Sequence, residues 1–251
     1  MSDRQGAALM IVLWIVVALA AVSSGVVLAT RSTTGIAANY RARAIGRYAA
    51  ESGVALAVAT LEDGLATAVD PAERRDYLNH LDRALGAHAE TTLGDARLAL
   101  ALVDVGSRLD ANVADARSLA RLFSFFTGST GAEVAAEAVR AYAAGRPEEG
   151  LEAARQLRSV DELFDIPGMP PELARWASGF LTVDGDGTIN RATASEPVLA
   201  AAAGELRDEP SRILVRSRGW REGHPMTHEI EAVYAVVGSE LTLVRWRESD
   251  R

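Results

Sequence analysis

The 251-residue chain contains no cysteine and no lysine. Without cysteine, disulfide bonds, thiolate metal sites and cysteine nucleophiles are excluded. All 26 basic residues are arginine, and 34 acidic residues give a formal net charge of -8. A chain with this excess of acid repels the negative phosphate backbone, so nucleic acid is not expected as its main partner.

The sequence also lacks the motifs of common catalytic folds. It has no nucleophile elbow, no phosphate-binding loop and no dinucleotide fingerprint. His224 and His228 stand four apart, but on the strand expected there such residues lie about 13 Å apart, too far to share a metal ion. His80 and His88 flank polar segments, where we expect them to be solvated. We therefore expect no enzymatic activity.

The N-terminal segment is the most apolar part of the chain. Residues 7–30 carry no charged side chain and follow a polar leader that ends in Gly6. At about 1.5 Å per residue, a helix of about 24 residues spans roughly 36 Å, enough for the core of a bilayer. The helical pattern continues to about residue 62, which predicts one helix about 80 Å long. Its lower half carries a stripe that needs a partner: Ile36, Tyr40, Ala44 and Tyr48.

Two other interpretations of the N-terminal segment stay open. Ala18-Leu19-Ala20 could serve as the cleavage site of an ordinary secretory signal peptide, because it follows an apolar stretch of about 11 residues. The segment could also be a plain single-pass anchor. Charge leaves its orientation undecided or reversed, since Arg4 stands alone before it and further arginines follow at positions 31, 41, 43 and 47.

The remainder of the chain mixes helix and strand patterns. A short helix is predicted from Pro71 to near Gly86. Residues 97–105 are predicted to form a first strand, although their alanine and leucine content would also suit a helix. Residues 115–180 have helical character throughout, with breaks at 128–131 and 145–147. After Gly204, three segments alternate like antiparallel strands, with a tight turn at Gly238-Ser239 between the last two: 213–215, 227–237 and 241–246. The pattern predicts an α+β fold.

A weak repeat links the two sides of the helical block. Residues 109–115 match residues 189–195, and in each copy an extended polar stretch leads into a helix. Asp115 and Ser195 are the expected N-caps, and Pro197 falls in a first turn, where its missing N–H is harmless. Coincidence in an alanine-rich chain is the alternative explanation.

Residues 159–173 contain the sharpest motif of the polar part, a helix, a turn and a second helix. Ser159 and Glu162 form a capping box, and Gly168 can adopt a positive φ. Two prolines, at 170 and 171, start the second helix and remove amides that a DNA-binding hairpin would need. We therefore predict a packing role for this hairpin, whose centre is Pro167, Gly168 and Met169.

The segment 184–189 has the sequence of the middle of an EF-hand loop. Its calcium candidates are Asp184 and Asp186. When Gly187 is aligned with loop position six, the twelfth position falls on Thr193, so the bidentate carboxylate is missing. A plain turn is the favoured interpretation.

The N-terminal leader resembles a type IV prepilin signal. The resemblance rests on the six leader residues and on Ala7-Ala8-Leu9-Met10-Ile11-Val12-Leu13-Trp14. It implies that prepilin peptidase cleaves between Gly6 and Ala7 and that Ala7 becomes N-methylated. Most pilins carry a glutamate at the fifth mature position, which is Ile11 here. The absence of that acid is typical of the K-type minor pseudopilins of the type II secretion system.

Two further features resemble the same K-type family. Residues 159–173 are similar to its "S-V-D-E-L-x-x-V-P-G-M-T-P-E-L" segment. The repeat at 109–115 and 189–195 is similar to its "I/L-N-x-N-T/S-A" pattern, which occurs at both edges of an inserted helical domain. Asp110, Val113 and Ala192 depart from that pattern.

The resemblance implies a pseudopilin fold: a long N-terminal transmembrane helix, an antiparallel sheet, and a large inserted α-helical domain. The implied segments are a leader (1–6), a transmembrane segment (7–30), the continuation of its helix (31–62), the start of the pseudopilin domain (63–108), the insertion (109–182) and the rest of the domain (183–251).

The implied function is to cap the tip of the secretion pseudopilus and so take part in protein export across the outer membrane. The implied partners are the I-type and J-type minor pseudopilins. The implied location is the bacterial inner membrane, crossed once, with the C-terminal domain in the periplasm. No cofactor is implied except calcium, which some K-type relatives bind. The alternative is a periplasmic binding module exported by a conventional signal peptide.

Overall fold

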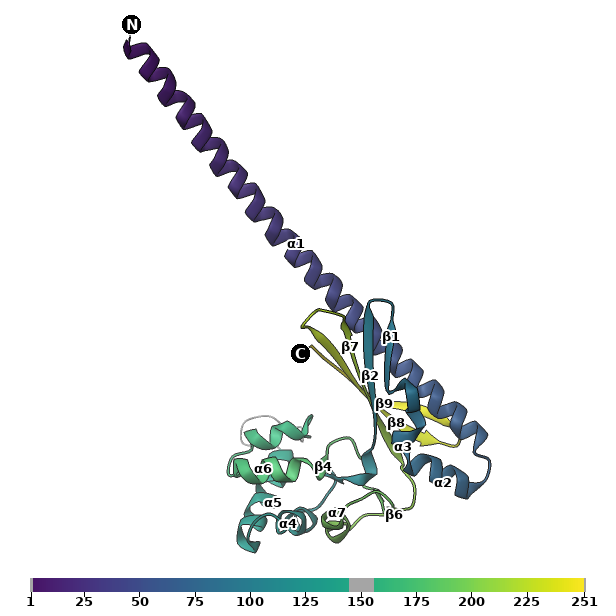
Figure 1. The fold of residues 1–251 in the computed structure, drawn as a ribbon. Helices are drawn as coiled ribbons and strands as arrows, with labels where there is room; N and C mark the ends of the chain where they lie inside the picture. Colours follow the sequence, from purple (N-terminus) through teal and green to yellow (C-terminus); the bar gives the residue numbers. More distant parts are fainter. Residues whose placement is uncertain (1, 145–155, 251) are drawn as a thin grey trace.

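The structure is a computed structural model of the full chain. It describes the backbone of residues 2–144 and 156–250, and their side chains apart from those of 2–9, 11–12, 25–34 and 87. A long helix, an antiparallel sheet and a group of short helices make up the described part (Figure 1). The short helices lie at the end of the molecule opposite the N-terminus.

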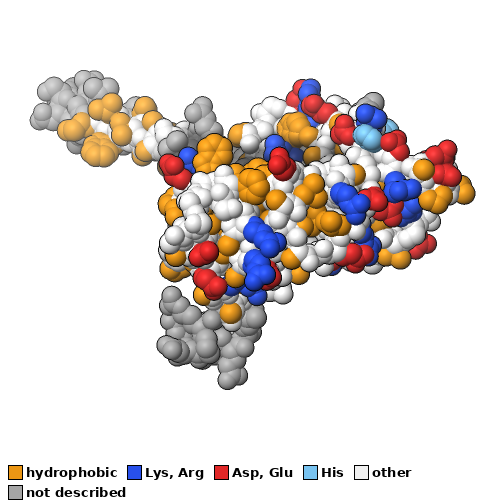
Figure 2. All heavy atoms as spheres, turned by 90° about the horizontal axis from the view of Figure 1, so that it is seen from below, with side chains coloured by type: hydrophobic (Ala, Val, Ile, Leu, Met, Phe, Trp, Pro, Cys, Tyr) orange, Lys and Arg blue, Asp and Glu red, His pale blue; other side chains and the backbone are white. Residues whose placement is uncertain are grey.

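The helix α1 (Ser2–Thr67) is continuous, and its first half stands away from the rest of the molecule (Figure 1). It continues past residue 62, its predicted end, because no proline interrupts the chain before Pro71. Figure 2 shows hydrophobic side chains exposed along the described part of the projecting half. Among the residues described, no helix has both the length and the apolar character needed to cross a membrane.

The second half of α1 packs on one face of the sheet. Its buried residues recur three or four apart, as expected for one helix face: Ala42, Ala49, Ala50, Val54, Ala57, Leu61 and Leu65. The approach is close, since a Cβ on Gly219 of the sheet would lie 2.2 Å from the carbonyl oxygen of Gly46 on α1. This pair of glycines therefore sets the distance between helix and sheet.

The sheet has five antiparallel strands in the order β1-β2-β7-β8-β9. They are β1 (Glu90–Leu93), β2 (Ala96–Asp104), β7 (Arg212–Arg221), β8 (Thr227–Val237) and β9 (Glu240–Asp250). The predicted antiparallel sheet and the strands predicted in it are confirmed. β1 has no counterpart in the prediction, because 4 residues are too few to display alternation. Gly238 adopts a φ of 62° in the predicted turn between β8 and β9.

Two short helices and a 3-10 turn connect α1 to the sheet: α2 (Pro71–Asn79), α3 (Leu81–Leu85) and η1 (Gly86–Ala89). Asp70 caps α2, since its Oδ1 accepts the N–H of Ala72 at 2.7 Å. The single helix predicted here is wrong, because His80 has a non-helical backbone (φ -122°, ψ 49°) that separates α2 from α3.

A helical insertion connects the neighbouring strands β2 and β7. Its elements follow in this order: η2 (Val105–Ser107), β3 (Leu109–Asp110), α4 (Ala116–Phe123), α5 (Ser129–Ala144), η4 (Val160–Asp165), α6 (Pro171–Ser178), β4 (Leu181–Thr182), β5 (Ile189–Asn190), α7 (Glu196–Ala201) and β6 (Leu206–Arg207). The region 115–180 is less regular than predicted, because η4 is a 3-10 helix. The break predicted at 145–147 lies outside the described residues.

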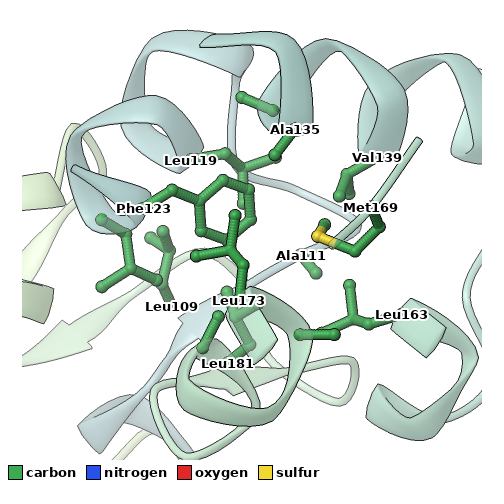
Figure 3. Packing of buried hydrophobic residues seen from close by; sticks show 14 of the residues in the cluster. Leu109, Ala111, Leu119, Phe123, Ala135, Val139, Leu163, Met169, Leu173 and Leu181 are labelled. Carbon is green, nitrogen blue, oxygen red and sulfur yellow. The ribbon is translucent and has the colours of Figure 1, made fainter. Parts of the chain in front are cut away.

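The insertion has its own hydrophobic core (Figure 3). Phe123 of α4, Val139 of α5 and Leu173 of α6 are among its buried residues. Val198 of α7 belongs to the same core, so the packed unit extends beyond residue 182, where the predicted insertion ends. The resemblance implied that residues 183–251 belong to the rest of the pseudopilin domain, but Val183 and Ile189 are also buried in the core of the insertion.

Candidate functional site

The two repeated segments lie where the insertion joins the sheet, and they have the same local geometry. Oδ1 of Asp110 accepts the N–H of Asn112 at 2.7 Å, and Oδ1 of Asn190 accepts the N–H of Ala192 at 3.0 Å. In each copy the backbone oxygen of the same residue accepts an N–H four positions later, at 2.8 and 2.9 Å. The repeat is therefore structural, and the departure at Asp110 is harmless because a carboxylate accepts the same bond.

The two predicted N-caps differ in chemistry. Oδ1 of Asp115 accepts the N–H of Ser118 at 2.7 Å, as a cap of α4 should. Ser195 occupies the N-cap position of α7, but its side chain makes no capping hydrogen bond. Its hydroxyl is buried without a hydrogen-bond partner among the described residues. The sequence thus predicted the N-cap positions of both residues, but it did not predict that Ser195 makes no capping hydrogen bond.

A buried polar cluster ties the end of β2 and the end of α2 to the insertion. Oδ2 of Asp104, at the end of β2, accepts hydrogen bonds from Thr193 and, at 2.7 Å, from the amide of Asn190. The same amide donates to Oδ1 of Asn79 at 2.8 Å, which adds the end of α2. Burial raises the pKa of Asp104, and the hydrogen bonds from Thr193 and Asn190 oppose that shift. The cluster therefore joins three distant parts of the chain.

The first calcium candidate, Asp184, forms a second link between the insertion and the sheet. Its carboxylate lies 2.9 Å from Arg245 and 2.6 Å from Arg247, both on β9. Its side chain is only 6% exposed, so both guanidinium groups meet it largely out of water. Arg212 adds two hydrogen bonds to the backbone oxygens of Asp184 and Gly185, at 2.8 and 2.7 Å. A cation at Asp184 would have to displace these arginines.

The second calcium candidate, Asp186, is also engaged. Its Oδ1 accepts hydrogen bonds from the Thr188 hydroxyl at 2.6 Å and the Ser211 hydroxyl at 3.2 Å. Burial opposes the ionisation of Asp186, but these bonds and the charge of Arg212 outweigh it, so its pKa lies below the ordinary value. In the part of the chain that is described, no three His, Asp or Glu residues are grouped to hold a metal ion.

The predicted hairpin packs into the insertion. Gly168 adopts a φ of 87°, and the N–H of Met169 donates to the oxygen of Ile166 at 3.1 Å. Met169 is 7% exposed and lies in the core shown in Figure 3. The capping box is shifted by one residue, because Glu162 accepts the N–H of Arg158 at 3.2 Å instead of that of the N-cap Ser159.

A groove of about 650 Å³ lies between α1 and the end of β9. Tyr40 and Tyr48 of the predicted stripe line it and are 69% and 67% exposed, so the stripe is uncovered in this chain. On the other side, His228 is buried and lies 2.7 Å from Oδ1 of Asp250, which also pairs with Arg43. Hydrogen bonding by His228 holds the pKa of Asp250 below its ordinary value. The Arg43, His228 and Asp250 side chains that line the groove are therefore paired with one another.

His224 lies before β8 and its Nε2 is 3.2 Å from Oδ1 of Asn39, so it shares no site with His228. Gly6, Ala7 and Ile11 all lie in α1, and their side chains fall outside the described part. Cleavage, methylation and the missing acid stay predictions.

A network of arginine and glutamate side chains crosses the face of the sheet turned away from α1, and the sequence interpretation missed it. Glu229 has a side chain only 2% exposed and lies 3.1 Å from Arg218 and 3.7 Å from Arg216. Arg216 donates two hydrogen bonds to Glu231, at 3.0 and 2.8 Å, and Glu231 lies 3.1 Å from Arg247. The sequence feature that could have predicted this network is the alternation of charged residues: arginine at 216 and 218 on β7, and glutamate at 229 and 231 on β8.

Comparison with known proteins gives a likeness to a solved structure. No family model matches the chain, and no curated protein matches it. A chain in the crystal structure of the GspK-GspI-GspJ complex from the Type 2 Secretion System of enterotoxigenic Escherichia coli is similar, with a TM-score of 0.60 and 14% identity. The match covers 88% of the present chain and 99% of that chain. At this identity the likeness establishes a shared, pseudopilin-like fold.

Proposed function

We propose that this protein is a K-type minor pseudopilin of a type II secretion system. The observation that carries the proposal is the joint arrangement of α1, the antiparallel sheet and the helical insertion between β2 and β7. This arrangement corresponds over 99% of a chain from the GspK-GspI-GspJ complex. The leader that ends in Gly6 supports a pilin-like protein in general, and the acid missing at Ile11 and the hairpin at 159–173 support the K type among the components of that complex.

The position of the insertion supports a role at the tip of the pseudopilus. Pseudopilin subunits associate through their N-terminal helices, and the insertion lies at the opposite end of this molecule (Figure 1). A packed domain at that end obstructs the addition of a further subunit above it. The acid missing at Ile11 agrees with this role, because in pilins it pairs with the terminal amine of an adjacent subunit. The function is therefore mechanical and associative, with I-type and J-type minor pseudopilins as partners and no catalysis.

The N-terminal segment supports export and anchoring. Prepilin peptidase is proposed to cleave between Gly6 and Ala7, after which residues 7–30 hold the protein in the inner membrane and the C-terminal domain lies in the periplasm. Apolar side chains on the described part of this segment are more than half exposed and have no partner within the described chain: Met10, Leu13, Trp14, Ile15, Val16, Val17, Leu19 and Val22. A bilayer or the helices of neighbouring subunits would cover them.

Two measurements test this function. Mass spectrometry of the mature protein should find N-methylated Ala7, and a Gly6→Leu variant should stay unprocessed. A mature terminus at Ala21 would instead indicate a conventional signal peptide and a periplasmic binding module. Co-expression of the full chain with I-type and J-type minor pseudopilins should give a complex that survives purification in detergent. A chain that purifies alone in the presence of both partners would contradict the proposal.

A further inference from the structure

The turn formed by residues 183–186 directs its oxygen atoms at arginine side chains. The carboxylate of Asp184 accepts hydrogen bonds from Arg245 at 2.9 Å and from Arg247 at 2.6 Å. The backbone oxygens of Asp184 and of the residue after it accept hydrogen bonds from one nitrogen of Arg212, at 2.8 and 2.7 Å. The backbone oxygen of the residue before it accepts a longer bond from Arg245, at 3.5 Å. Five oxygens of this turn, two from the carboxylate and three from the backbone, therefore meet three guanidinium groups.

Carboxylate and backbone oxygens are also the ligands that calcium prefers in proteins. The sequence of residues 184–189 suggested a loop of this kind, and some K-type relatives bind calcium. A calcium ion needs about six to eight oxygen ligands. The oxygens of this turn already accept hydrogen bonds from positively charged donors, and an ion would have to break those bonds. The turn therefore has the donor atoms of a cation site, but arginine side chains use them.

The charge around the turn is balanced without an ion. A cavity of about 210 Å³ beside the turn is lined by two acids, Asp110 and Asp184, and by two arginines, Arg212 and Arg245. Oδ1 of Asp110 also accepts two backbone N–H groups, at 2.7 and 3.3 Å. Even when both carboxylates are ionised, the two arginines match their charge. An incoming cation would meet no excess of negative charge here, although buried carboxylates need a positive partner of some kind.

The three arginines also connect the turn to the sheet. Arg212 begins β7, whereas Arg245 and Arg247 lie on β9, so the sheet supplies all three positive charges to the insertion. Arg245 and Arg247 donate further hydrogen bonds to the backbone oxygen of Arg158 in the insertion, at 2.9 and 2.6 Å. A guanidinium group stays protonated in proteins, and it is covalently part of the chain. The connection therefore needs no free ion from the surroundings.

We propose that Arg212, Arg245 and Arg247 take the place of a bound divalent cation at residues 183–186, so that the insertion is held to the sheet without calcium. The comparison with calcium-binding relatives rests on the proposed function, whereas the arginine contacts do not. The insertion then keeps its place on the sheet when calcium is removed, and calcium does not regulate the fold of this chain.

The first test compares the full chain in detergent with an excess of calcium chloride and with a chelator. The two melting temperatures should differ by less than about 1 °C. Calcium present at about a hundredfold its dissociation constant would instead raise the melting temperature by roughly 5–10 °C. A rise of that size that is absent from an Asp184→Asn variant would overturn the proposal.

The second test removes the positive charges from β9. Arg245→Gln and Arg247→Gln, made together in the full chain, should lower the melting temperature, because the carboxylate of Asp184 loses both charged partners. An excess of calcium chloride should then raise it by at least about 5 °C, since the ion supplies the missing charge. Arg191→Gln with Arg207→Gln is the matched control. It removes the same charge from exposed ion pairs and should give no response to calcium.

The outcomes separate this proposal from the proposed function. A double variant that folds but does not respond to calcium would overturn the proposal, because the turn would then have no affinity for the cation that the arginines are proposed to replace. If the double variant does not fold, Arg245→Gln alone takes its place in the same assay. Neither test involves a partner protein, so a calcium-dependent wild-type chain would leave the proposed function standing. A mature terminus at Ala21 would overturn the proposed function and leave the melting experiments unaffected.

Discussion

Asp184→Asn should lower the free energy of unfolding by about 2–3 kcal/mol. The carboxylate accepts hydrogen bonds from Arg245 and Arg247 at 2.9 and 2.6 Å, and its side chain is 6% exposed. Asparagine has nearly the same shape but keeps one acceptor oxygen and no charge, so both arginines lose their ion-pair partner in the insertion. Removing one member of a fully buried pair costs about 3–5 kcal/mol. The arginines are 30% and 27% exposed, so water offsets part of that loss.

The assay is urea unfolding of the full chain in detergent, followed by far-ultraviolet circular dichroism and by tryptophan fluorescence. Trp246 lies on β9 beside the two arginines, and Trp176 lies on α6 in the insertion, so fluorescence reports on both sides of the link. Asp165→Asn is the control, because Asp165 is exposed and its substitution should change stability by less than about 0.5 kcal/mol.

The reasoning would be refuted by an Asp184→Asn effect as small as that of the control. Such a result would mean that solvent already satisfies the arginines and that Asp184 does not hold the insertion to the sheet. A loss of the same size that vanishes in 1 M salt would also contradict it, since a link that is largely out of water should be screened only weakly.

Three further predictions concern other parts of the fold. Gly219→Ala should lower the free energy of urea unfolding by more than about 3 kcal/mol, because the new Cβ would lie 2.2 Å from the backbone of α1. Gly128→Ala is the control and should change this free energy little, because the space around Gly128 is open. Asp250→Asn should lower the free energy of urea unfolding at neutral pH. The difference from wild type should disappear as the pH falls through the depressed pKa of Asp250, because the ionised carboxylate that His228 binds is then lost in the wild type as well. A difference in free energy that does not depend on pH would contradict this. Met169→Ala should lower the melting temperature by an amount equivalent to about 2–4 kcal/mol, and a silent substitution would show that the hairpin does not support the core.

The arrangement of elements was predictable where local signals are strong. Alternation at 213–215 and 227–237 defined the strands, and the absence of proline before Pro71 defined the long helix. Gly168 could be assigned a positive φ from its place between two helices, and the structure gives 87°. These features depend on backbone conformation over a few neighbouring residues, which the sequence encodes directly.

The links between distant segments were not predictable. Asp184 was interpreted as part of a possible loop for a cation, because its neighbours in sequence are glycine and aspartate. Its actual partners, Arg245 and Arg247, lie 61 and 63 residues away and reach it only after β9 is placed in the sheet. The same holds for Asp104, whose partners Asn190 and Thr193 come from the far side of the insertion. Pairs of residues so far apart in the chain cannot be recognised from one sequence until the topology of the sheet and the insertion is known.

The insertion between β2 and β7 has a consequence for the order of folding. Asp104 of β2 is opposite Ile213 of β7, so these strands can pair only when the ends of a very long loop meet. Closing a longer loop costs only about 0.6 kcal/mol per doubling of its length, but the search is slow because the contacts are far apart in sequence. If the insertion folds first, its own core brings β3 and β5 together and delivers Asp104 next to Asn190. The insertion would then act as an intramolecular template, and the sheet would be the last part of the chain to form.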